Sequence, residues 1–142
     1  MMSKPDAFFP VPVTQAANVT RAVELFEARK LDETVTYTRT ELERVEKTVA
    51  LKLKKPDGIA DSPSEQFRDL TLLLTNALVA LARWSDAKEV LGRYRVRFPQ
   101  DAWGFAAGAQ VTRADPRVKD QAAVQRAIEL LEGEAKRLEA IK

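Results

Sequence analysis

One segment in the middle of the chain reads as a helix that must be covered on several sides. Ser62, Pro63 and Glu65 mark its start, because they supply an N-cap serine, a proline at the first helical position and the glutamate of a capping box. Residues 67–82 then place leucine and other apolar side chains on almost every helical face. A helix of this kind needs neighbours around it, so we expect it to form the centre of an all-α fold.

Helical periodicity predicts five further helices around this one. Apolar residues three and four positions apart indicate helices over residues 18–29, 32–54, 85–98, 102–114 and from residue 117 nearly to the C-terminus. Asp32, Ser85 and Asp101 are placed to cap three of them. Short connections pair the six helices into three antiparallel hairpins, which we expect to form a single domain over residues 18–142. Gly104 and Gly108, one turn apart, predict a notch where a neighbouring element packs closely.

Residues 1–17 have a different composition and are expected to form an extended arm. Pro5, Pro10 and Pro12 exclude a helix there, because proline removes a donor and restricts the residue before it. Adjacent phenylalanines are costly to leave in water, so the arm is expected to pack either on its own domain or on a neighbouring subunit. The partner-binding candidates in the arm are Phe8, Phe9, Val11 and Val13.

Composition argues against most enzymatic and metal chemistry. The 142 residues include no cysteine and no histidine, which removes thiolate and imidazole ligands and nucleophiles. No Gly-rich phosphate loop, nucleophile elbow or paired-carboxylate motif is present. We therefore expect no catalytic residues, no metal and no cofactor. No apolar run approaches the roughly 20 residues that span a bilayer, so we expect no membrane insertion and a cytoplasmic protein.

Residues 71–99 resemble a tetratricopeptide repeat, a two-helix unit that stacks into solenoids. The positions that carry the resemblance are Leu74, Leu78, Leu81, Ala82, Trp84, Ala87, Leu91 and Pro99. Thr75 and Tyr94 depart from the family pattern, and the turn around Leu31 looks like a degenerate version of the same repeat. A solenoid and a plain helical bundle are both compatible with the pattern.

The resemblance implies a groove that holds a segment of a protein partner. Mapped onto this chain, the groove positions of the central helix are Asp69, Leu72, Asn76 and Val79. Those of the fifth helix are Trp103, Ala106, Gln110 and Arg113. We therefore expect a non-enzymatic adaptor, or a structural subunit of a homo-oligomer or larger assembly, that binds protein through this groove, the arm, or both.

Two basic clusters support an alternative, a helical module associated with nucleic acid. They consist of Lys52, Lys54 and Lys55 and of Arg93, Arg95 and Arg97. Arg93 and Arg97 are one helical turn apart and are the candidates for contacting phosphates. The net charge of +2 is small, however, and basic residues near a helix C-terminus also complement the helix dipole.

Overall fold

The computed structural model describes residues 16–53, 65–99, 101–117 and 120–140, with side chains given outside residues 48–53. These ranges contain six α-helices and no strand, which confirms the all-α prediction. The helices are α1 (Ala17–Glu27), α2 (Leu31–Leu53), α3 (Glu65–Ala80), α4 (Trp84–Arg97), α5 (Ala102–Ala114) and α6 (Gln121–Ala140). Residues 1–15 of the predicted arm and the predicted helix start at Ser62 and Pro63 lie outside the described residues, and α1 begins at Ala17, within the range predicted as arm.

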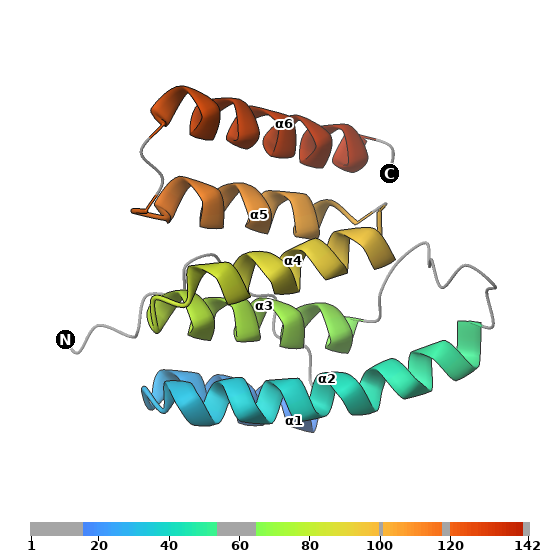
Figure 1. The fold of residues 1–142 in the computed structure, drawn as a ribbon. Coiled ribbons are helices and arrows are strands. Elements are labelled where there is room, and N and C mark those ends of the chain that lie inside the picture. Colours follow the sequence, from blue (N-terminus) through green and yellow to red (C-terminus); the bar gives the residue numbers. More distant parts are fainter. Residues whose placement is uncertain (1–15, 54–64, 100, 118–119, 141–142) are drawn as a thin grey trace.

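The helices are stacked in chain order from α1 and α2 at one end to α6 at the other (Figure 1). Each helix packs against the next one in the sequence, and α3 also packs against α1 and α5. Within the described ranges, α1 does not reach α6, and the backbones of α2 and α4 do not pack against each other. The three hairpins therefore form an open-ended stack, because the first and last helices do not close on each other.

The turns of the first two hairpins share one geometry. Arg29 and Ala82 follow the first helix of each pair and adopt left-handed conformations, with φ of 62° and 59°. In both turns this residue and its successor donate their N–H groups back to carbonyls in the last turn of the helix, as in a Schellman motif. The bonds run from Arg29 to Phe26, Lys30 to Leu25, Ala82 to Val79 and Arg83 to Leu78. Leu31 and Trp84 consequently occupy equivalent places, as the first residues of α2 and α4.

α3 is the helix around which the stack is built. All of its residues from position 69 to position 79 are buried, as the apolar pattern predicts. Leu70 and Leu73 pack on α1 and α2, while Leu72 and Leu78 belong to a cluster that includes residues of α4 and α5. One helix therefore supplies apolar contacts to four others, which makes α3 the main source of hydrophobic stabilisation.

The predicted helix starts are confirmed at one position and wrong at two. The side chain of Asp101 accepts a hydrogen bond from the Trp103 backbone N–H, as an N-cap does. Asp32 and Ser85 do not cap, since α2 begins at Leu31 and α4 at Trp84. The two left-handed turns bring the chain into helical geometry two residues earlier than the cap pattern indicates, and both side chains fall inside the first turn.

Gly104 and Gly108 form the predicted notch on α5. A Cβ at Gly104 would lie 2.9 Å from Cδ1 of Tyr94, and one at Gly108 would lie 2.4 Å from Nη1 of Arg95. The side chains of α4 therefore occupy the space that the two missing Cβ atoms leave. Gly92 and Gly133 differ, because no heavy atom lies within 4 Å of the corresponding Cβ position.

These surroundings predict opposite effects for glycine-to-alanine changes. Gly92→Ala and Gly133→Ala should each raise the free energy of unfolding by about 0.5–1 kcal/mol, because alanine restricts the unfolded chain and both sites are open. Gly104→Ala should lower it by about 1–3 kcal/mol, because the buried Tyr94 ring must move. Urea unfolding of the three variants measures these changes, and a destabilising Gly92→Ala would contradict the open surroundings of that site.

Asp115 fastens the turn between α5 and α6 to α4. Its carboxylate lies 2.7 Å from Nζ of Lys88 and accepts hydrogen bonds of 2.9 to 3.0 Å from the backbone and guanidinium of Arg117. Arg117 also donates to Oγ of Ser85, which gives that serine its role in the fold. The hydrogen bonds from Arg117, followed by those from Lys88, hold the pKa of the Asp115 carboxyl far below its ordinary value of 3.8.

A carboxyl with a depressed pKa stabilises the folded state above its ordinary pKa and loses that effect as the pH falls below it. Asp115→Asn should therefore lower the free energy of unfolding by about 2 kcal/mol at pH 7, and the deficit should shrink as the pH is lowered towards about 2. Glu24→Gln, which removes an exposed ion pair with Arg21, is the control and should cost less than about 0.5 kcal/mol. A deficit that is unchanged at acid pH would contradict this account.

Candidate interaction surfaces

The groove positions expected on α3 lie in the core. Asp69, Leu72 and Asn76 have exposed fractions of 0%, 1% and 2%, and Val79 is buried as well. Leu72 and Val79 share a cluster with Ala107 of α5. A partner therefore cannot touch these four side chains in this conformation. The apolar pattern correctly identifies α3 as covered, but it does not reveal which faces its own chain covers.

The groove positions on α5 are divided between two neighbours. Trp103 is half-buried, and the Arg68 guanidinium of α3 lies 5.7 Å from the centre of its ring while also pairing with Asp69 at 3.0 Å. Asp69 and Trp103 are thus brought together through Arg68. At the other end of the helix, Arg113 bonds to Gln110 and pairs with Glu132 of α6 at 2.8 Å. Ala106 packs against a small cluster formed by α5 and α6.

The three arginines of α4 do not form a common basic surface. Arg93 pairs with Glu89 at 2.6 Å on the same helix, and Arg97 pairs with Glu46 of α2. Arg95 lies across the α5 notch and donates to the Gly104 carbonyl at 3.3 Å, and burial lowers its pKa. Because the pairs neutralise two of the charges and the third is partly buried, this helix presents no row of free cations. The Lys52 side chain, Lys54, Lys55 and the arm residues Phe8, Phe9, Val11 and Val13 lie outside the described residues.

A groove of about 1130 Å³ lies between α2 and α4, and we call it the α2–α4 groove. It exists because both helices pack on α3 without packing their backbones on each other. Its floor consists of Leu42, Phe67, Thr71, Leu74, Val90 and Tyr94. All of these are buried or half-buried, so the groove has a largely apolar base.

An aromatic cluster closes one end of the α2–α4 groove. The Phe98 ring lies 5.4 Å from Phe67 and 5.2 Å from Tyr94, and the Arg97 guanidinium lies 5.7 Å from the Phe98 ring centre. The Tyr94 hydroxyl donates to Asp101 at the start of α5. Burial and this hydrogen bond raise the pKa of Tyr94, so the phenol stays neutral and its hydrogen bond links α4 to the start of α5. The ion pair between Glu46 and Arg97 then spans the groove at this end.

The rim of the α2–α4 groove carries charges of both signs. Glu89 pairs with Arg93 and Glu46 with Arg97, which leaves Arg39 and Glu43 of α2 without an ion-pair partner among the described residues. The α4 rim also contains Gly92 and Val96, and Val96 is 75% exposed. Sequence reasoning missed this groove, since it depends on the separation of two helices that are distant in the chain. A glycine in the middle of α4 with no local role was the one available indication.

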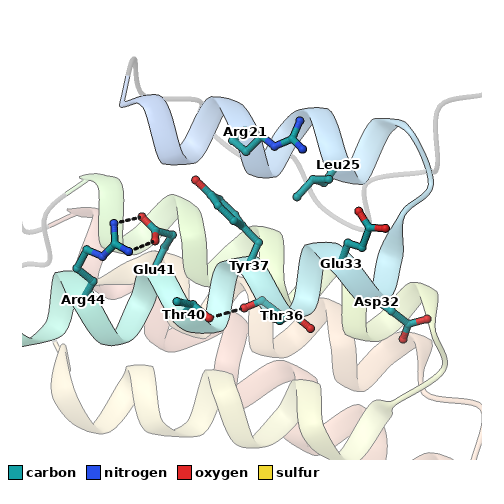
Figure 2. Close-up of a pocket in the computed structure, with 9 residues that line it drawn as sticks. All are labelled: Arg21, Leu25, Asp32, Glu33, Thr36, Tyr37, Thr40, Glu41 and Arg44. Atoms are coloured by element: carbon teal, nitrogen blue, oxygen red, sulfur yellow. Dashed lines mark hydrogen bonds and ion pairs between the residues drawn. The ribbon is translucent and has the colours of Figure 1, made fainter.

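A smaller cleft of about 590 Å³ lies between α1 and α2 (Figure 2). Tyr37 points towards α1 there, and burial followed by the charge of Glu41 raises its pKa. Glu41 pairs with Arg44 at 3.3 Å and accepts a hydrogen bond from Asn18 at 3.2 Å. The hydrogen bond from Asn18 joins α1 to α2, and the pair with Arg44 lies within α2, so the packing of the first hairpin explains both contacts of the carboxylate.

Neither metal-binding nor membrane-spanning features occur in the part of the chain that the structure describes. No three His, Cys, Asp or Glu side chains lie close enough there to hold a metal ion. None of the six helices combines the length and apolar character needed to cross a membrane over its described residues.

Comparison with known proteins finds no matching family model, no similar curated protein and no similar solved structure. The function is therefore inferred from the geometry of the fold.

Proposed function

We propose that this chain is a non-enzymatic protein-binding module, acting as an adaptor or as a structural subunit of a larger assembly. The observation that supports this most is the α2–α4 groove, an open surface with an apolar floor and charged rims. Protein interfaces commonly have such an apolar centre and polar surround. A groove between two helices also suits the docking of a third helix, which inserts one apolar face between them.

The placement of the strongly perturbed groups favours binding over catalysis. Tyr94 and Asp115 have the largest shifts in pKa, and each is engaged in a contact that joins two helices. A catalytic acid or base needs an ionisable group that can reach a substrate. The Tyr94 ring contributes to the groove floor, but its hydroxyl is bonded to Asp101. The groove therefore offers contact area and charge.

The resemblance to tetratricopeptide repeats fits this proposal with one important difference. The equivalent turns at Arg29 and Ala82 agree with a repeated two-helix unit. They are farther apart in the sequence than the period of about 34 residues in that family. The family's usual groove is lined by the first helix of each pair, where α3 is buried in this chain. We accordingly assign binding to the opposite side of the stack, between the second helices α2 and α4.

A displayed library of amphipathic helical peptides tests this assignment with a defined probe. Val96→Glu places a charge over the apolar floor. Peptides selected on the full chain should therefore bind this variant at least about tenfold more weakly, a loss of about 1.4 kcal/mol of binding free energy. Arg39→Glu should weaken peptides that carry an acidic residue at the matching position and strengthen those that carry a basic one.

Ala17→Glu is the matched control, because it also places a glutamate on an exposed helical position but lies on α1, away from the groove. Calorimetric titration of each variant with the selected peptides gives the affinities. The proposal would be contradicted if no helical peptide bound the chain above background. It would also be contradicted if the affinity of the selected peptides were unchanged by both Val96→Glu and Arg39→Glu.

A further inference from the structure

Two helices carry the same unexplained combination of residues. In the described part of the chain, the large apolar side chains that stand exposed are Val96 on α4 and Leu130 on α6, each at 75%. Each lies about one turn from an open glycine, Gly92 or Gly133. Val96 and Gly92 line the α2–α4 groove, whereas Leu130 and Gly133 are exposed on the last helix of the stack.

The two glycines have a cost that the fold of one chain does not offset. A glycine in a helix interior is less favourable than alanine by about 1 kcal/mol. At Gly104 and Gly108 the close packing of α4 side chains offsets this cost. At Gly92 and Gly133 no heavy atom lies within 4 Å of the Cβ position, so no such packing offsets it. A glycine lets another backbone approach closely, so both sites suit a helix that comes from outside the chain.

The outer face of α6 forms a ridge that fits the groove. α6 turns Ile128, Ala135 and Leu138 towards the stack, and its exposed residues lie on the opposite side. The exposed residues that define this α6 ridge are Arg126, Glu129, Leu130, Gly133 and Arg137. The ridge therefore has one large apolar side chain at its middle, flanked by charges of both signs.

The charges of the α6 ridge complement those of the groove rim. On α2, Arg39 precedes Glu43 by about one helical turn, and neither has an ion-pair partner among the described residues. On α6, Arg126 precedes Glu129 by a similar distance along the helix. An α6 helix running antiparallel to α2 brings Glu129 to Arg39 and Arg126 to Glu43. The same placement puts Leu130 over the apolar floor.

We propose that the α6 ridge of a second copy of this chain docks in the α2–α4 groove. This inference rests on the proposed function, because it names the occupant of the same groove. The two surfaces belong to different elements, so the contact is head-to-tail, and a bound pair of copies still offers one free groove and one free ridge. Association then continues beyond two copies, until it closes into a ring or extends as a chain. Because one helix face fills one groove, we expect a small interface with an affinity on the order of micromolar.

Complementation between two variants tests the proposal with the full chain. In light scattering over about 1 µM to 1 mM, the wild-type mass should rise with concentration past that of a dimer. Val96→Glu blocks the groove and Leu130→Glu blocks the ridge, so each variant alone should remain monomeric. An equimolar mixture should form a dimer that grows no further, because one variant supplies the intact groove and the other supplies the intact ridge.

The folding of each variant and the mass of each sample together decide whether the proposed contact exists. Circular dichroism checks that both variants keep the helical fold and melting temperature of the wild type, as expected for exposed sites. A monomeric wild type at all concentrations, association of either variant alone, or no recovery in the mixture overturns the proposal. If the wild type is monomeric while selected helical peptides still depend on Val96, the groove stands as a binding site and only the second copy fails as its occupant.

Discussion

The burial of α3 on all sides is the constraint on which the rest of the structure depends. An apolar helix of this kind requires neighbours around it, and α1, α2, α4 and α5 supply them. Because α2 and α4 both pack on α3, they do not need to pack on each other. The groove between them is therefore a direct consequence of how the core is formed. Its apolar floor is the outer side of the same core, with Phe67 and Leu74 contributing from α3 itself.

Polar contacts supplement the apolar packing that joins α4 to the segments after it. The Tyr94 hydroxyl joins the end of α4 to Asp101 at the start of α5, and Asp115 joins the following turn back to α4 through Lys88. In both contacts a buried polar group has a hydrogen-bond partner, which is the condition under which its burial is tolerated. The same contacts contribute to the large pKa shifts of Tyr94 and Asp115. Their role is to hold successive helices in register.

The sequence predicts the helices well because their signals are local, but it does not predict which surfaces remain open. The α3 apolar run and the Asp101 cap follow from neighbouring residues alone. The N-cap predictions at Asp32 and Ser85 were wrong because the left-handed turns at Arg29 and Ala82 set the helix starts. The burial of Asn76 and the opening beside Val96 depend on how helices distant in the chain are spaced. Periodicity carries no information on that spacing.

The central claim is that the α2–α4 groove receives the α6 ridge of another copy, and disulfide trapping tests it most directly. The chain has no cysteine, so Val96→Cys and Leu130→Cys each introduce a unique thiol. A disulfide forms readily only when the two Cα atoms come within about 7 Å. Mixing the two variants under mild oxidation should give a covalent dimer containing one copy of each, faster than either variant links to itself. Equal rates for all three pairings would show that the two surfaces do not meet.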